Sequence, residues 1–434
     1  MDAADAEAVA QLAALGLTVR DVQAIVSCQD EFAVRCPVIT RAVADGIRFT
    51  ARPIDLGGGA FTNMYELRVD LGSECAVEPL SRSDAFFLAD VVGADPAAVS
   101  AVSGTFSLIS DDPTYQPHER CFDLCIRGGR LVSLPLTEKP VFWHASGRPF
   151  IARAAPQGVL YVGGRAFGWA GARATEVPVA ALGGLGLPAL GVSSAASCRV
   201  QYRDSDVLPF LRVVDRSGNR TGLTETVVDA VVTDRGDGLV VERLYPGGNA
   251  DLFAGNFILR GRPDAFADVR PGTAVRVATV GNTAVAAVVS ALTLGPSVAD
   301  GAVGRTGGYG EELGSSPFRG VRHARTTVGI DGGTLTARVF DGAPAAAGFT
   351  GVTPAETAAL TGYLGDDPDR TFHVDGGGSS KMVIRDENGG RAVFGSMHYV
   401  AWPKDGSRTF RWQGLLGRPL VSCFAIRASP LAGR

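Results

Sequence analysis

The chain has 434 residues, of which 46% are hydrophobic and 20% charged, and its formal net charge at pH 7 is −4. This length allows one large or two ordinary domains, and the apolar content supports a sizeable core. A weakly acidic chain with no run of Lys or Arg lacks the electrostatic footprint of a nucleic-acid-binding protein. No apolar stretch is long enough to cross a membrane, so we expect neither nucleic acid nor membrane as a partner.

The N-terminal residues and the cysteines bear on the cellular compartment. The first residues are acidic and show no basic segment followed by an apolar run, so the sequence predicts no secretory signal. The seven cysteines are odd in number and scattered, which is typical of a reduced interior, and we therefore expect a cytoplasmic protein. Cys121 and Cys125 lie four residues apart in a strand-like run, and we interpret them as small core residues rather than zinc ligands. The Ala-, Gly-, Val- and Arg-rich composition is typical of a GC-rich bacterial source.

The predicted elements begin with helices and continue with strands. Residues 4–15 form an Ala-rich helical pattern, and a capping box at Thr18 starts a second helix. From about residue 46 the hydrophobic period changes to two, which indicates strands. We therefore predict a helical N-terminal extension over residues 1–45 and a single large domain over residues 46–434. Its predicted fold class is α+β, with a β-rich mixed sheet and a few short helices packed on it.

Two further elements precede the main motif. Ser81 to Asp84 is interpreted as the start of a short helix that runs from Ala85 to Val92. A buried strand at 99–102 then leads into Ser103-Gly104-Thr105-Phe106, which is either a pocket wall or an ordinary transition from strand to loop.

The region from residue 322 onward predicts a strand–helix–strand unit. Arg325 and Thr326 stand at the mouth of a strand, and Asp341 follows its partner strand. Thr353-Pro354-Ala355-Glu356 has an N-cap, a proline at the first helical position and a capping glutamate, so a helix begins here. Capping is a sufficient role for Glu356, and we favour it over catalysis on position alone. The next strand ends in Asp375, at the edge where open α/β sheets tend to place ligands.

A glycine-rich turn follows that strand, with the sequence Asp375-Gly376-Gly377-Gly378-Ser379-Ser380-Lys381. Three consecutive glycines are costly in chain entropy, and the amides of such a turn can converge on an anion. Asp375 can act as an acid, a base, a nucleophile or a ligand, and Lys381 adds a cation. The alternative interpretation is a tight turn in which Asp375 caps its own backbone. For the nearby His323 and His373 we favour a packed or surface position over a proton shuttle.

These segments together resemble the phosphodiester glycosidase family. The resemblance rests on the order Arg325-Thr326-Thr327-Val328-Gly329, Asp341-Gly342, Glu356 on the following helix, and Val374 to Ser380. Residues 103–106 are similar to an upstream Asn-Gly-Gly-Phe-Phe segment of that family, and residues 417–422 to its last strand, so the likeness spans about residues 45–430. Ser103 and Thr105 replace the usual Asn and Gly, and Lys381 stands where a small or hydroxyl residue is usual.

The resemblance implies that residues 46–434 are a catalytic domain that cleaves the bond between a sugar anomeric carbon and a phosphodiester or phosphate. Asp375 would be the base or nucleophile, and Glu356 or Asp341 the second carboxylate. The substrate and phosphate would be held by residues of the motif segments, namely Arg325, Thr326, Gly376, Gly377, Gly378, Ser379, Ser380, Lys381, Ser103, Gly104 and Phe106.

Two other functions remain open at this point. One is a lyase or transferase that uses the same site on a nucleotide-sugar-like intermediate of specialised metabolism. The other is a non-catalytic protein that binds sugar phosphates. The expected partner in each case is a small sugar phosphate, and no cofactor is required. Calcium or magnesium is allowed by the Asp-rich loops although no ligand spacing demands it, and the sequence does not define the oligomeric state.

Overall fold

The computed structural model describes most of the chain from residue 35 onward. The described residues are 35–108, 120–121, 123–171, 187–194, 200–203, 210–213, 218–304, 322–342, 351–386, 389–395, 398–401, 409–412 and 419–429. The helices predicted at 4–15 and after Thr18 lie outside them, so the division at residue 45 stays a prediction. Strand β1 (Ile39–Ala44) pairs with β2 (Ile47–Gly57) at this boundary.

The fold is mostly β, which corrects the α+β prediction. The described residues contain three α-helices, α3 (Leu88–Ala94), α4 (Val298–Ala302) and α6 (Pro354–Tyr363). The strands form several separate sheets and a closed barrel instead of one mixed sheet, and β13 (Arg165–Gly171) with β14 (Ala189–Ser193) is the parallel pair among them. The predicted helix at 85–92 is also wrong in its start, because residues 81–86 continue β4 (Cys75–Phe86). None of the described helices has the length and hydropathy needed to cross a membrane.

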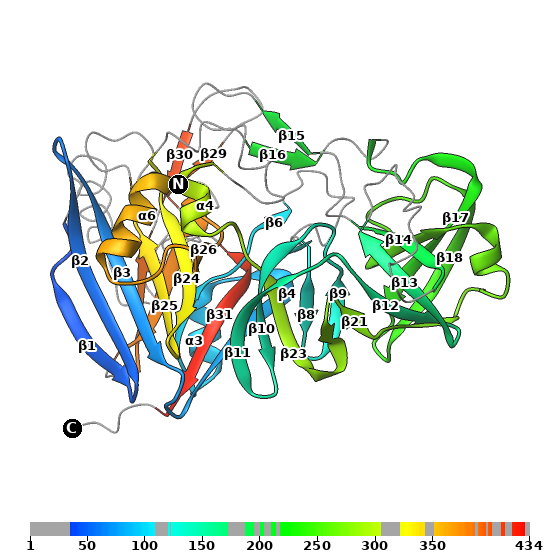
Figure 1. The fold of residues 1–434 in the computed structure, drawn as a ribbon. Coiled ribbons are helices and arrows are strands. Elements are labelled where there is room, and N and C mark those ends of the chain that lie inside the picture. The colour runs from blue at the N-terminus through cyan, green and yellow to red at the C-terminus, as the bar shows by residue number, and fades with distance from the viewer. Residues whose placement is uncertain are drawn as a thin grey trace, which may run out of the picture.

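Two sheets packed face to face form the part of the molecule that carries the motifs, on the left of Figure 1. The six-stranded sheet has the order β1, β2, β3 (Ala60–Asp70), β25 (Thr334–Phe340), β24 (Arg325–Asp331) and β26 (Thr371–His373). The five-stranded sheet has the order β28 (Arg391–Gly395), β27 (Lys381–Arg385), β5 (Ala98–Ser103), β31 (Leu420–Ala428) and β4.

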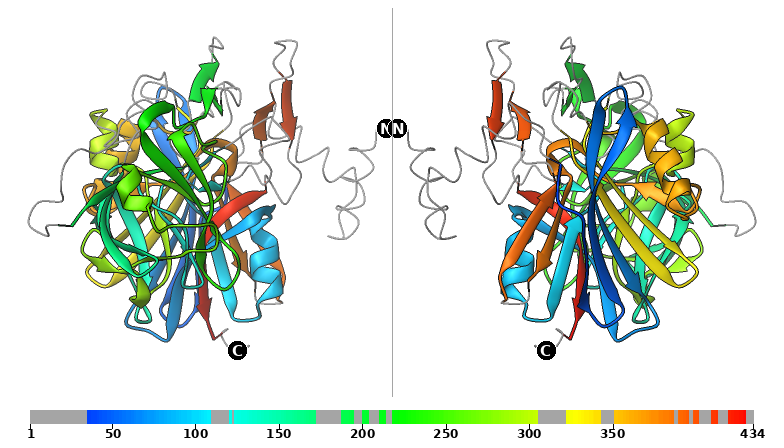
Figure 2. Two further views of the ribbon diagram at one scale, coloured as in Figure 1. Left: turned by 90° about the vertical axis from the view of Figure 1, so that its right-hand side faces the viewer. Right: turned by 90° about the vertical axis from the view of Figure 1, so that its left-hand side faces the viewer.

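The core of this sandwich follows from the alternation of side chains along each strand. Val328 and Val339 of the six-stranded sheet pack in one buried cluster with Met382 and Phe424 of the five-stranded sheet. Helix α3 covers the outer face of the five-stranded sheet, and α6 lies with Met64 and Phe340 on the outer face of the other. Figure 2 shows α3 and the α4–α6 pair on opposite sides of the sandwich.

A second sheet and a barrel extend from the sandwich to the right in Figure 1. A second five-stranded sheet has the order β11 (Arg148–Ala154), β10 (Lys139–Ala145), β23 (Val288–Thr293), β8 (Cys125–Arg127) and β9 (Arg130–Ser133). The barrel consists of β12 (Gln157–Val162), β13, β14, β19 (Phe257–Gly261), β17 (Leu223–Asp234), β18 (Leu239–Gly248) and β20 (Ala274–Val277). Four two-stranded ladders complete the description: β6 (Ser107–Leu108) with β7 (Arg120–Cys121), β15 (Val200–Arg203) with β16 (Phe210–Val213), β21 (Thr279–Val280) with β22 (Thr283–Ala284), and β29 (His398–Ala401) with β30 (Thr409–Trp412).

Candidate active site

The glycine-rich turn joins the two sheets of the sandwich. Strand β26 of the six-stranded sheet ends at His373, and β27 of the five-stranded sheet begins at Lys381. Between them, the 3₁₀ turn η7 (Gly377–Ser379) reverses the chain. The amide of Asp375 donates a hydrogen bond of 3.0 Å to the carbonyl of Gly104 at the end of β5. The turn is therefore held by both sheets, at the end of the sandwich that carries the α4–α6 pair (Figure 1).

Arg325 and Asp375 lie on neighbouring chain segments at this end. Strands β24 and β26 are antiparallel, with Thr327 paired to His373. Beyond the ladder, Val374 N donates to Thr326 O (3.1 Å) and Gly377 N donates to Ala324 O (2.8 Å). The register therefore shifts by one residue, and Asp375 with Gly376 lies across from Arg325 between these two hydrogen bonds. The backbone thus brings the segment of the predicted cation beside the segment of the predicted carboxylate.

The predicted strand–helix–strand unit is present as β25, α6 and β26, but the sheet around it is antiparallel. Helix α6 connects β25 to β26, and β26 returns beside β24 in the opposite direction. The Asp375 turn is therefore placed by an antiparallel sheet, and the analogy with the strand ends of open parallel sheets does not apply.

Ser103 holds the turn from behind. Its side chain is fully buried, and its Oγ accepts a hydrogen bond of 2.8 Å from the amide of Lys381. The same hydroxyl donates to the carbonyl of Ser379. Ser103 was predicted to touch the substrate. Its hydroxyl instead forms hydrogen bonds with Ser379 and Lys381 of the turn, so Ser103 fixes the shape of the turn.

The backbone amides of the turn are mostly engaged within the protein. Gly376 N donates to Asp375 Oδ1 at 2.9 Å, which confirms that Asp375 caps its own turn. The amides of Gly377, Ser379 and Ser380 donate to backbone carbonyls at 2.8, 3.1 and 3.0 Å. Gly378 has the one amide of this turn without a hydrogen bond to a described residue. Of the turn amides that were predicted to converge on an anion, Gly378 N is therefore the one that remains available for a ligand among the described residues.

Gly104 allows the close approach of two strands at the site wall. A Cβ at this position would lie 2.5 Å from Ser422 Oγ and 2.6 Å from the carbonyl carbon of Ser422 on β31. Its own amide donates to Ser422 O at 3.1 Å. Phe106 follows and lies against Gly295, where a Cβ would be 3.0 Å from the Phe106 ring. Gly104 therefore serves packing, and Phe106 is half-buried against the cluster that contains Leu252 and Ile258.

We expect the substitution Gly104→Ala to lower the free energy of unfolding by about 1–3 kcal/mol, because backbone atoms of β31 must move to admit the methyl group. Chemical denaturation measures this change. The control is Gly362→Ala in α6, where the nearest atom to the new methyl would be Pro368 Cγ at 3.8 Å. That control should be neutral or stabilising, since Ala favours helix more than Gly. Equal stability of wild type and Gly104→Ala would contradict the close approach.

Arg325 provides the positive charge on the outer face of the site. Its Nε donates a hydrogen bond of 2.8 Å to Val352 O. Burial lowers the pKa of Arg325 to about 10, with Glu356 opposing the shift, so the guanidinium keeps its charge at pH 7. Burial, followed by the charge of Arg325, lowers the pKa of His323 to about 4 and that of His373 to about 3. Both imidazoles are neutral at pH 7, and the favoured interpretation of His373 as packed is confirmed, since it is 6% exposed.

Three buried side chains beside the turn have polar atoms with unmet hydrogen bonds. Within the described residues, Thr326 Oγ1, Ser380 Oγ and His373 Nε2 have no partner. Such groups are rare inside proteins and commonly serve a ligand or an ordered water. Two of these atoms belong to predicted binding residues, and His373 joins them as a residue that sequence reasoning had set aside.

Asp341 and Lys381 are both buried near the turn. Burial raises the pKa of Asp341 to about 6, while the amide of Gly342 and the charge of Lys381 pull it back. The Asp341 backbone is fixed by β3, through Thr62 Oγ1 to Asp341 O (2.6 Å) and Asp341 N to Asn63 O (2.8 Å). The side chain of Lys381 is fully buried and its ammonium donates to Gly378 O, so it supports the turn from inside. No local signal in the sequence pointed to Thr62 or Asn63.

Glu356 has the structural role that the sequence favoured. Thr353 and Glu356 form a complete capping box at the start of α6. Both Glu356 oxygens also face Arg322, with the closest contact at 2.6 Å. Although partial burial raises the pKa of Glu356, the hydrogen bonds from Arg322 and Thr353 outweigh it and the pKa is lowered. Arg322 was missed because the two residues are 34 positions apart. Of the two candidates for second carboxylate, Asp341 is the one without such a capping role.

Residues 226–419 match the model of the phosphodiester glycosidase family. This match confirms the resemblance, and it contains the motif segments from Arg325 to Lys381. Residues 103–106 lie outside it.

Solved structures of three proteins are similar to this chain at low sequence identity. A hypothetical protein from Synechocystis is 14% identical with a TM-score of 0.52, and the alignment covers 91% of this chain and 64% of that one. The chain therefore spans about two thirds of that protein's length, and the likeness is one of fold. A putative exported protein from Burkholderia pseudomallei is 18% identical (TM-score 0.49, covering 85% and 74%). The zebrafish N-acetylglucosamine-1-phosphodiester alpha-N-acetylglucosaminidase catalytic domain, auto-inhibited by its pro-peptide, is 12% identical (TM-score 0.35, covering 91% and 89%). A search of curated proteins finds no match.

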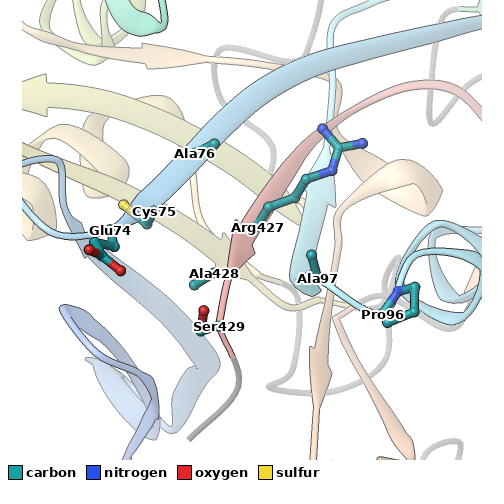
Figure 3. Close-up of a pocket in the computed structure, with 8 residues that line it drawn as sticks. All are labelled: Glu74, Cys75, Ala76, Pro96, Ala97, Arg427, Ala428 and Ser429. Carbon is teal, nitrogen blue, oxygen red and sulfur yellow. The ribbon is translucent and has the colours of Figure 1, made fainter.

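A hollow of the surface lies away from the glycine-rich turn. That hollow lies between the start of β4, the segment before β5 and the end of β31 (Figure 3). Its one arginine, Arg427, is paired with Glu78 and Asp95 (2.6 Å to Asp95). Since β5 begins near this hollow and ends at Ser103, the two features lie at opposite ends of the sandwich. In the described part of the chain, no group of three His, Cys, Asp or Glu side chains is arranged to hold a metal ion.

Proposed function

We propose that this protein is a hydrolase that cleaves the bond between the anomeric carbon of a sugar and the oxygen of a phosphate ester. The observation that carries the proposal is the backbone pairing at and beyond the ends of β24 and β26, which sets Arg325 across from Asp375 and Gly376. The family match of residues 226–419 supports the same reaction class. A cation beside a carboxylate fits a substrate with an anionic leaving group next to a carbon that develops positive charge.

In this proposal Arg325 binds the phosphate. Its guanidinium can donate two parallel hydrogen bonds to phosphate oxygens, and Gly378 N adds a backbone donor from the turn. Both nearby histidines are neutral at pH 7, so they contribute hydrogen bonds but no charge. The unpartnered hydroxyl of Ser380 is a further donor at the same turn, whereas Thr326, next to Arg325 on β24, points to the opposite face of the sheet.

Asp375 acts on the sugar in this proposal. A carboxylate close to the anomeric carbon stabilises an oxocarbenium-like state as a nucleophile, or takes a proton from an attacking water. A phosphate ester is a good leaving group, so little help from a general acid is needed. Asp341, with a pKa of about 6, is the proposed second carboxylate, since near that pH it can both hold and release a proton.

The substitution Arg325→Ala should weaken binding of a glycosyl phosphate about tenfold to hundredfold, equivalent to about 1.5–3 kcal/mol for a lost charged hydrogen bond. Calorimetric titration measures the affinity, and Arg325→Lys should recover part of it, because Lys keeps the charge without the paired donors. Circular dichroism shows whether the variants fold. A folded Arg325→Ala protein with unchanged affinity would exclude Arg325 from the phosphate site.

The function itself is tested by product analysis. Purified protein is incubated with UDP-N-acetylglucosamine and with simple glycosyl phosphodiesters, and the products are separated by chromatography. Release of free sugar supports the proposed hydrolysis. A dehydrated or transferred product would instead show a lyase or transferase, and tight binding without turnover would show a sugar-phosphate-binding protein.

A further inference from the structure

Two cysteine thiols lie together behind the wall of the site. Cys121 ends β7 and Cys125 begins β8, and the two side chains pack with Leu292 and Val421 in a small buried cluster. Cys121 is 8% exposed and Cys125 is 1% exposed. Their sulfur atoms share a hydrogen bond with each other. The interpretation as small core residues holds for their burial, but it leaves this direct contact between thiols unexplained.

The pKa values of the two thiols are shifted in opposite directions. Arg127 Nε donates to Ser81 Oγ at 3.2 Å, and Ser81 Oγ lies 3.2 Å from Cys125 Sγ. The hydrogen bond from Cys121 lowers the pKa of the Cys125 thiol, burial opposes it, and Ser81 and the Arg127 charge add to the lowering. For Cys121, the same contact with Cys125 and burial raise the pKa. One thiol is therefore disposed to ionise, and the other to keep its proton and donate it.

We propose that Cys121 and Cys125 form an oxidisable dithiol, which closes to an intramolecular disulfide when hydrogen peroxide reaches it. The Cys125 thiolate attacks one peroxide oxygen, so that an S–O bond forms and the O–O bond breaks. The departing hydroxide takes up the proton that the Cys125 thiol released and leaves as water. Cys121 sulfur then attacks Cys125 sulfur, the S–S bond forms, the S–O bond breaks, and the second hydroxide leaves as water with the Cys121 proton. The peroxide is reduced and the two thiols lose two hydrogen atoms in total.

The pair is connected to the site wall through backbone and side-chain contacts. Cys121 pairs with Ser107 in the short β6–β7 ladder. Ser422 contacts the Cys121 thiol, and its Oγ donates to Thr105 O at 3.3 Å. Formation of the disulfide removes the thiol hydrogen from this arrangement. We therefore expect the oxidation state of the pair to affect the positions of residues 104–107, which include Phe106.

Mass spectrometry of the full-length protein tests the proposal. The folded protein is treated with hydrogen peroxide, alkylated under denaturing conditions and digested with trypsin, which yields residues 121–127 as a peptide with these two cysteines alone. We expect that peptide to lose two hydrogen atoms and to resist alkylation. Cys423 serves as an internal control, because burial raises its pKa to about 12 and it should stay a free thiol.

Single variants separate the roles of the two sulfurs. In Cys121→Ser, dimedone should trap a sulfenic acid on Cys125, whereas in Cys125→Ser it should leave Cys121 unlabelled. Circular dichroism checks that both variants fold, and Cys125→Ala replaces Cys125→Ser if the added hydroxyl disturbs the core. The proposal is overturned if the 121–127 peptide is fully alkylated after peroxide treatment, if either cysteine is linked to a different one, or if peroxide closes the bond only in unfolded protein.

Discussion

Replacing Asp375 with asparagine is expected to lower kcat by about 10³-fold while leaving the free energy of unfolding nearly unchanged. The amide has the shape of the carboxylate but neither its charge nor its basicity, so it can neither attack the anomeric carbon nor take a proton from water. The fold should tolerate the change. Asn offers a side-chain oxygen that can still accept the hydrogen bond from Gly376 N, now 2.9 Å long.

Steady-state kinetics with the substrate identified by product analysis measures this effect. The matched control is Asp369→Asn, because Asp369 is an exposed carboxylate just before β26 while Asp375 is just after it. The control enzyme should keep wild-type kcat. Thermal melting of both variants separates lost chemistry from lost structure. Near-normal turnover by Asp375→Asn would remove this residue from the mechanism and leave the cation opposite it without its proposed partner.

Local features of the site were predictable from the sequence. The capping box at Thr353 depends on residues three apart, and the helix forms where the pattern placed it. A strand beginning at Val328 and a partner strand from Thr334 to Val339 were predicted, and the structure has strands at 325–331 and 334–340. The self-capping of Asp375 depends on the next residue alone. Each of these features depends on interactions within one turn or one strand, which a linear pattern records.

Long-range features could not be derived in this way. The hydroxyl of Ser103 donates a hydrogen bond to the carbonyl of Ser379, although the two residues are 276 positions apart in the sequence. No pattern in either segment predicts this contact with the other. The α+β prediction was wrong for a related reason: the strands divide into several sheets and a closed barrel, and that division depends on pairings between segments distant in sequence. The pairing of β24 with β26 is one of them, and it brings Arg325 near Asp375 along the backbone.

The glycine-rich turn shows how composition and geometry differ. Its three glycines correctly indicated an unusual backbone, and Gly377 has a positive φ of 61°. Composition did not reveal that most amides of the turn would donate to oxygens of the protein itself. Nor did it reveal that Lys381 would be buried with its ammonium on Gly378 O. Which donors face a ligand is decided by contacts between strands that are distant in sequence.

The second large effect expected is a pH-dependent gain in stability on replacing Asp341 with asparagine. The pKa of Asp341 is raised from 3.8 to about 6 by burial. The folded protein therefore binds more protons than the unfolded chain between these values, and its stability falls as pH rises through this window. Above pH 6 the carboxylate is charged in both states, and the full cost of burying it, about 3 kcal/mol from the size of the shift, is present. Below about pH 4 it is protonated in both states and this cost vanishes.

Asp341→Asn lacks the titration, so its stability relative to wild type should be greater at pH 8 than at pH 4. Chemical denaturation at several pH values measures the difference, and the exposed carboxylate of Asp268, substituted as Asp268→Asn, provides the control with little pH dependence. If Asp341 is the second carboxylate, the Asp341→Asn protein should also have lost much of its activity. The wild-type protein would then keep this buried charge, although it lowers stability, because the reaction needs it. A stability difference that is equal at both pH values, or larger at pH 4, would show that Lys381 and the Gly342 amide compensate the buried charge in full.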